Sequence, residues 1–120
     1  MSILNRIEAS VDLERIEHNF FEIKRFTGGA EMICVIKADA YGHGAVKLGL
    51  LYEKLGAEML AVACLDEALE LRRGGITLPI LILGATPTKL AYLLVQNKFV
   101  QSVHNLNYAL ELESELSRLE

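Results

Sequence analysis

The sequence is poor in cysteine and proline, contains no tryptophan and has no long apolar run. Its two cysteines, Cys34 and Cys64, are far apart and each sits in an apolar stretch, which indicates neither a disulfide framework nor a metal cluster. We expect both to be reduced thiols buried in the core. No apolar stretch approaches the roughly 20 residues that a helix needs to cross a bilayer, so we expect no membrane partner.

Basic residues are also too few to dominate the charge of the chain. Twelve lysines and arginines are outnumbered by sixteen aspartates and glutamates, and the formal net charge is −4. This balance argues against binding a phosphate backbone through bulk charge, and we expect no nucleic-acid partner. Residues 1–5 lack the basic segment, apolar run and cleavage site of a secretory signal, which favours a cytoplasmic location. His18 and His104 have no partner at metal-ligand spacing, so we predict no metal site.

The chain does have enough apolar sequence for one folded domain, and its helical and strand signals alternate with little linker between them. A short extended stretch at residues 7–11 precedes a helix that Asp12 caps and that Thr27 and two glycines end. Four strands follow, each with a helix after it. The strands are expected at 32–36, 59–64, 80–83 and 100–103, and their helices after His43, from Asp66 to Arg73, from Pro87 to Asn97 and from Asn105. The first strand shows no polar alternation, as is typical of a strand covered on both faces.

Four successive strand–helix units predict an α/β fold with parallel strands joined by right-handed crossovers. Both a doubly wound sheet and a TIM-type (β/α) barrel have this pattern, and periodicity alone does not separate them. Because four helices follow four strands, the barrel interpretation makes the chain a half-barrel, the first four units of the usual eight, preceded by a short strand and a helix.

The most informative segment reads Val35-Ile36-Lys37-Ala38-Asp39-Ala40-Tyr41-Gly42-His43-Gly44. A buried strand here ends in a lysine and turns through two glycines into a helix. One interpretation is structural: Lys37 extends its amine from the strand end into solvent or pairs with Asp39. The other is chemical, because parallel architectures place ligand chemistry at the carboxyl ends of their strands, and a lysine amine there can condense with an aldehyde cofactor.

The neighbours of Lys37 fit the chemical interpretation to different degrees. Tyr41 can offer a hydroxyl to a phosphate, although a surface ring is its alternative role, and the glycines let backbone approach closely. His43 opens a helix and is interpreted as an orienting residue outside the catalytic set. Gly42 and Gly44 do not form a dinucleotide-binding loop, because the third glycine at the required spacing is missing.

The same segment resembles the pyridoxal-phosphate attachment motif of alanine racemases. The agreement extends over about residues 7–104. It includes Ser10-Val11-Asp12-Leu13, Asn19, Ala61-Val62-Ala63, Glu67-Ala68, Leu71-Arg72, Gly75-Ile76 and Pro79-Ile80-Leu81. The resemblance implies an isomerase that interconverts L-alanine and D-alanine through a pyridoxal-phosphate aldimine and so supplies D-alanine for peptidoglycan.

The resemblance also implies roles for four residues. Lys37 would hold pyridoxal phosphate and then act as one of two proton-transfer bases. Tyr41 would help hold the phosphate, and Val35 and Leu83 would line the pocket of the cofactor ring. The family's second base, a tyrosine of the other subunit, and the arginine that faces the pyridine nitrogen come from regions outside these 120 residues.

In that family an eight-unit barrel is followed by a β-rich domain, and the active sites are completed across a homodimer. The resemblance therefore implies that residues 1–120 are the amino-terminal part of the barrel domain, without its carboxyl-terminal half-barrel and β-rich domain. Tyr52, Tyr92 and Tyr108 do not match the second base, and we expect packing or surface roles for them. We expect the chain alone to be inactive and to form a homodimer or self-associate through its uncovered strand edges.

Two other functions remain open on the sequence. One is a non-catalytic folding or interaction module that keeps the half-barrel without a working site. The other is a pyridoxal-phosphate-binding protein of cofactor homeostasis with a related fold, whose usual lysine context is less like residues 38–44 of this chain.

Overall fold

The computed structural model describes residues 7–119 as an α/β structure. The predicted extended stretch at 7–11 is irregular chain rather than a strand. The elements are α1 (Leu13–Phe26), β1 (Ile33–Val35), α2 (Lys37–Tyr41), α3 (Ala45–Leu55), β2 (Met59–Val62), α4 (Leu65–Arg73), β3 (Ile80–Ile82), the 3₁₀ turn η1 (Thr88–Leu90), α5 (Ala91–Asn97), β4 (Val100–Gln101) and α6 (Leu106–Leu116). All four predicted strands are present, and each is shorter than predicted.

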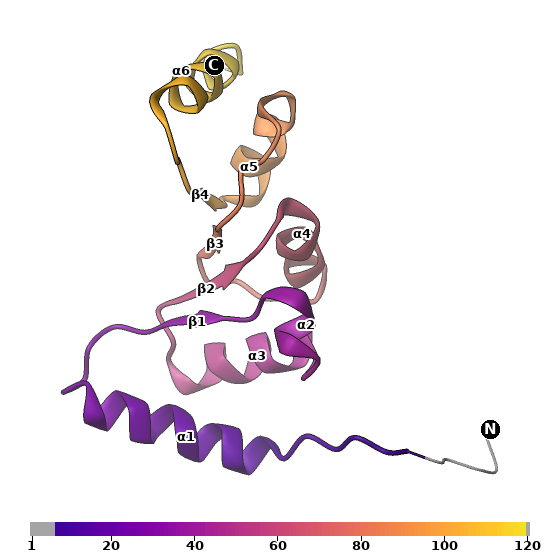
Figure 1. Ribbon diagram of the computed structural model, residues 1–120, viewed down its shortest axis with the longest axis vertical. Helices are drawn as coiled ribbons and strands as arrows, with labels where there is room; N and C mark the ends of the chain where they lie inside the picture. Colours follow the sequence, from indigo (N-terminus) through magenta and orange to yellow (C-terminus); the bar gives the residue numbers. More distant parts are fainter. Residues whose placement is uncertain (1–6, 120) are drawn as a thin grey trace.

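The four strands form one parallel sheet in the order β1-β2-β3-β4 (Figure 1). The register pairs Val35 with Ala61 and Ala61 with Leu81. Figure 1 shows α3, α4 and α5 on the same side of these strands. A doubly wound sheet reverses its strand order and carries helices on both faces, whereas sequential order with helices on one face is the arrangement in a TIM-type barrel. The structure therefore has the architecture of the first half of such a barrel.

The core lies between the sheet and the helices. Leu60, Val62, Ile80 and Ile82 point toward the helices and are fully buried, and they pack in one cluster with Leu48, Ala68, Leu71 and Leu94. On the opposite face, Ile33, Val35 and Val100 are 54%, 42% and 41% exposed. The expectation that the first strand is covered on both faces is therefore wrong. Its apolar residues face the concave side of the sheet, which in a closed barrel is covered by strands across the interior.

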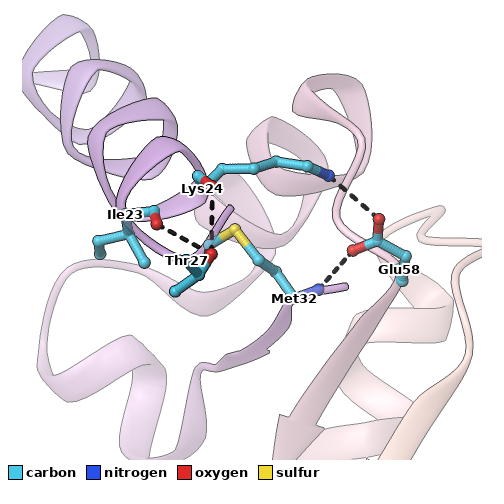
Figure 2. A network of polar contacts seen from close by, with 5 residues as sticks. All are labelled: Ile23, Lys24, Thr27, Met32 and Glu58. Carbon is cyan, nitrogen blue, oxygen red and sulfur yellow. Dashed lines mark hydrogen bonds and ion pairs between the residues drawn. The ribbon is translucent and has the colours of Figure 1, made fainter. Parts of the chain in front are cut away.

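Helix α1 packs against α3, where Phe20 contacts Tyr52, and its carboxyl end is bonded to the segments that lead into β1 and β2. Figure 2 shows the Glu58 carboxylate between the Lys24 amine, at 3.1 Å, and the backbone N–H of Met32. The Thr27 hydroxyl donates to the carbonyl oxygens of Ile23 and Lys24, which ends the helix where the sequence predicted. At the other end the Asp12 carboxylate caps the helix by accepting from two backbone N–H groups, as expected.

Two smaller expectations need correction. The helix predicted from Pro87 to Asn97 is the 3₁₀ turn η1 followed by α5. Both cysteines are free thiols, as predicted, but Cys64 is exposed and only Cys34 is partly buried. Cys64 is the residue before α4, where the chain leaves the sheet. Within residues 7–119 no helix is both long and apolar enough to span a bilayer.

Candidate active site

The segment after β1 forms a tight left-handed turn that begins at Lys37. Ala38, Asp39, Ala40 and Tyr41 all have φ between 51° and 57°, so α2 is not a right-handed helix. The turn is closed by backbone hydrogen bonds from Ala40 to the Ile36 carbonyl, at 3.0 Å, and from Gly44 to the Asp39 carbonyl, at 2.9 Å. Because left-handed backbone costs an L-residue roughly 1–2 kcal/mol, four such residues in a row need strong local support.

Side chains of the turn supply part of that support. The Asp39 carboxylate accepts from the backbone N–H of Ala45 at 2.8 Å, and it thereby caps the start of α3. Nδ1 of His43 lies 2.9 Å from the Ala40 carbonyl oxygen, which is the orienting role predicted for this histidine.

A carboxylate from the next strand–helix unit, that of Glu67 on α4, supplies further support for the turn. Glu67 lies in the first turn of α4, and its two oxygens accept from the backbone N–H groups of two residues that come after different strands. One oxygen is 2.8 Å from the nitrogen of Ala38, and the other is 2.7 Å from the nitrogen of Ala63. Ala38 follows Lys37 directly and Ala63 follows β2. Glu67 therefore ties the carboxyl ends of β1 and β2 together beside Lys37.

Lys37 lies where the sequence predicted, at the carboxyl edge of the parallel sheet. The last hydrogen bond between β1 and the next strand runs from Ile36 to Ala61, one residue before it. Its side chain is half-buried, and within residues 7–119 its amine makes no hydrogen bond or ion pair, so the predicted alternative of pairing with Asp39 does not occur there. Tyr41 is 61% exposed, and its hydroxyl also has no bonded partner within that part of the chain.

The two predicted ring-pocket residues lie at the same edge but on different strands. Val35 is the last residue of β1 and also lines a cavity of about 310 Å³ with Ile16 and Tyr52. Leu83 follows β3, where its N–H donates to the Val62 carbonyl and its own carbonyl lies 2.9 Å from Nε2 of His104. Because β2 lies between them, Lys37 and Leu83 are about 10 Å apart across the sheet at the usual strand spacing.

The remaining tyrosines and His18 lie at packing or surface positions. Tyr52 is half-buried on α3, and burial raises the pKa of its phenol. Burial also raises the pKa of Tyr108, whose hydroxyl donates to the Thr86 carbonyl at 2.8 Å. Tyr92 is exposed on α5 and His18 is exposed on α1. Residues 7–119 contain no group of three metal-ligating side chains that could hold an ion.

Sequence reasoning missed the left-handed turn and the part that Glu67 plays in it. Two glycines signalled a turn after Lys37, but of Ala38, Asp39, Ala40 and Tyr41 only Asp39 is of a type that favours positive φ. Glu67 stood out only as part of a dipeptide shared with a family. Its contact with Ala38 joins residues 29 positions apart, so it depends on the relative placement of two strand–helix units.

Comparison with known proteins identifies relatives over almost the whole chain. The sequence model of the family described as "Alanine racemase, N-terminal domain" matches residues 11–120. An alanine racemase of Clostridium perfringens is 47% identical over 104 residues, which are 87% of this chain and 27% of that protein.

Solved structures give the same result. The alanine racemase of Clostridium difficile 630 superposes with a TM-score of 0.83 at 39% identity, over 93% of this chain and 31% of that one. A histidine racemase of Leuconostoc mesenteroides superposes with a TM-score of 0.81 at 31% identity, over 87% of this chain and 28% of that one. The chain thus spans about three-tenths of the length of the proteins that it matches.

Proposed function

The chain belongs to the alanine racemase family, and from that premise we propose that it is the lysine-bearing part of an enzyme that interconverts L-alanine and D-alanine. The observation that carries the proposal is the place of Lys37. Its amine lies at the carboxyl edge of a parallel sheet, where barrel enzymes carry their chemistry, and no carboxylate within residues 7–119 forms an ion pair with it. The matched family does not favour a folding module or a protein of cofactor homeostasis.

The residues at this edge fit pyridoxal phosphate. A cofactor aldehyde requires an amine that is not committed to another partner, and Lys37 provides one. Its phosphate requires a donor nearby, and the exposed hydroxyl of Tyr41 follows four residues later. Two carboxylates bonded to this turn, that of Asp39 within it and that of Glu67 on α4, accept hydrogen bonds from backbone N–H groups. When bound, the cofactor would supply an electron sink for the negative charge that develops at the substrate Cα.

The residues of this chain would then hold the reactants and move one proton. In its neutral form, Nζ of Lys37 would accept the proton from Cα on one face of the substrate or return a proton there. Inversion also requires a proton donor on the opposite face, and Tyr52, Tyr92 and Tyr108 do not fill that role, since their places on α3, α5 and α6 make them packing or surface residues. We propose that this second base comes from outside residues 1–120.

The proposal extends to the rest of the protein. Residues 1–120 would be the amino-terminal part of a pyridoxal-phosphate-binding (β/α)₈ barrel, completed by a second half-barrel and a β-rich domain. That second half-barrel would cover the exposed apolar residues of the concave face. The partners would be alanine and a second copy of the protein, as the family resemblance implies. The D-alanine formed would serve peptidoglycan synthesis in the cytoplasm.

Substrate choice in this family is not tied to the fold of these residues. The histidine racemase shares the fold of these residues at 31% identity, so closely similar half-barrels occur in enzymes named for different amino acids. We infer that side chains outside residues 1–120 select the substrate.

The test is a titration with pyridoxal phosphate, followed by the absorbance of the cofactor, on the 120-residue chain. We expect saturable binding by the wild-type chain and loss of that binding in Lys37→Ala. Lys47→Ala is the matched control, because Lys47 is an exposed lysine on α3, and it should bind as the wild type does. Equal binding by all three proteins would contradict the proposal.

A further inference from the structure

The backbone N–H of Ala38 has its hydrogen-bond acceptor outside its own strand and turn. It follows the last ladder bond of β1, and its acceptor is a side chain from another unit, the carboxylate of Glu67 at 2.8 Å. Ala38 is exposed, so without Glu67 this N–H would bond to mobile water instead of to an acceptor that is fixed on another element. The direction in which the chain leaves Lys37 is therefore set by the position of Glu67.

Glu67 is itself fixed by the helix that carries it. It is the third residue of α4, the position from which a glutamate usually reaches back to cap its own helix start. Here the residue before the helix, Cys64, makes no side-chain cap, and one Glu67 oxygen accepts from Ala63 at 2.7 Å. Because α4 also buries Leu65, Ala68 and Leu71 in the core, the carboxylate is held on a packed element.

We propose that Glu67 is a positioning residue that fixes the backbone from which Lys37 presents its amine. The two oxygens of one carboxylate join the carboxyl ends of β1 and β2, so residue 37 is held between the last ladder bond, at Ile36, and the anchored amide of Ala38. The inference rests on the proposed function for its consequence, the selective attachment of pyridoxal phosphate at Lys37. The placement of the backbone is independent of that function.

Glu67→Gln is the variant that tests this geometry. It keeps the size of the side chain but leaves a single oxygen acceptor, so either Ala38 or Ala63 loses its partner. Glu70→Gln is the matched control, because it makes the same change at an exposed position of the same helix. Both variants and the wild type are compared well below their unfolding temperatures, so that all are fully folded.

Two measurements are made on each protein. The first is amide hydrogen exchange by NMR, where we expect Ala38 or Ala63 to exchange about 10- to 100-fold faster in Glu67→Gln, as loss of a hydrogen bond to a charged group implies. The second is the ratio of label on Lys37 to label on Lys47 after limiting pyridoxal phosphate and borohydride, quantified by peptide mass spectrometry. We expect this ratio to fall about tenfold in Glu67→Gln and to stay unchanged in Glu70→Gln.

The outcomes separate the alternatives. Faster exchange with an unchanged labelling ratio would show that Glu67 only stabilises the fold and would overturn the proposal, as would unchanged exchange. If wild-type Lys37 is labelled no more than Lys47, the proposed function is contradicted. The exchange rate of the Ala38 amide in Glu67→Gln, compared with the wild type, then still tests whether Glu67 holds this backbone. If Glu67→Gln does not fold, Glu67→Asp, which withdraws both oxygens by one methylene, should shift both measurements in the same direction.

Discussion

At the scale of single residues, the site depends on a backbone conformation that its own side chains disfavour. Ala38, Asp39, Ala40 and Tyr41 have positive φ, although none of them is glycine. They are held by Asp39 on the start of α3, by His43 on Ala40 and by Glu67 on Ala38. The effect is to turn the chain away from the sheet at once after Lys37, which leaves the lysine at the edge and returns the backbone to the helix layer.

Replacing one of these residues by glycine should therefore stabilise the protein. Ala38 is exposed and has φ 51° and ψ 53°, so Ala38→Gly removes a left-handed penalty without removing buried surface. We expect the free energy of unfolding in urea to rise by about 1 kcal/mol, the balance between that penalty and the greater chain entropy of glycine. Ala109→Gly, in the right-handed helix α6, should lower it by about 1 kcal/mol. Changes of the same sign at both positions would contradict the left-handed turn.

The two cysteines should differ sharply in reactivity. Burial, with a smaller contribution from Glu58, raises the pKa of the Cys34 thiol to about 11, so only about one thiol in a thousand is ionised at pH 8. Cys64 is exposed. Iodoacetamide at pH 8 should therefore modify Cys64 first, with Cys34 following only as the protein unfolds. Equal rates in peptide mapping would show that Cys34 is not protected by the packing of α1.

The sequence predicted the residue types of the site better than it predicted their contacts. The sequence identified Lys37 as an amine at a strand end, and the structure places Lys37 at the carboxyl edge of the sheet, with the exposed Tyr41 at the end of the turn that follows. The support from Glu67 was not predictable, because it depends on how two strand–helix units lie relative to each other. The exposure of Cys64 was missed for a related reason: an apolar run continues past the strand to the point where the chain turns outward.

At the scale of elements, α1 is attached to the sheet by a contact that depends on pH. The pKa of Glu58 is lowered, first by the hydrogen bond from the Met32 N–H and next by that from Lys24. A lowered carboxyl pKa in the folded state means that the contact stabilises the docked helix fully above the ordinary value of 4.5 and that this contribution is lost as pH falls through the folded value.

We therefore expect acid to loosen α1 before it unfolds the sheet. After correction for intrinsic exchange, hydrogen exchange of residues 13–26 should be about 2- to 5-fold faster at pH 3 than at pH 6, as the loss of one largely solvated ion pair implies, while β2 and β3 stay equally protected at both pH values. Glu58→Gln should show faster exchange of α1 already at pH 6. Glu22→Gln, which breaks only an exposed pair with Arg25, should not. If hydrogen exchange of α1 changed with pH as much in Glu58→Gln as in the wild type, groups other than Glu58 would be responsible and this prediction would be contradicted.

The elements themselves were largely predictable, because local signals set their ends. Asp12 and Asn105 cap α1 and α6 through their side chains, and Gly56 ends α3 in a left-handed conformation. Strand lengths were overestimated, since an apolar run records burial and not the extent of pairing. The run 59–64, for example, ends as a strand at Val62, and its last residues lead into α4.

At the scale of the whole molecule, the sheet is covered on one face only. Ile80 is fully buried between the sheet and the helices, whereas Ile33 on the opposite face is 54% exposed. Sequence patterning could not show this difference, because both strands read as continuous apolar runs. The apolar character of the concave face is explained if that face is covered in the whole protein, as the proposed barrel requires.

This asymmetry predicts unequal costs for the same substitution. Ile80→Ala should lower the free energy of unfolding by about 2–5 kcal/mol, because it opens a cavity in the core. Ile33→Ala should lower it by less than about 1 kcal/mol, because the side chain is already half in solvent. Urea unfolding of both variants measures the difference. Similar losses would mean that the concave face is covered in the isolated chain, for example by a second copy.

The central claim is that the amine of Lys37 is the attachment point for pyridoxal phosphate. Reduction of the protein–cofactor mixture with borohydride, followed by proteolysis and mass spectrometry, identifies which lysine carries the cofactor. The account predicts the label on Lys37, in the peptide that contains Val35 to Gly44. A label spread over the exposed lysines, or concentrated at one of them and not at Lys37, would contradict it.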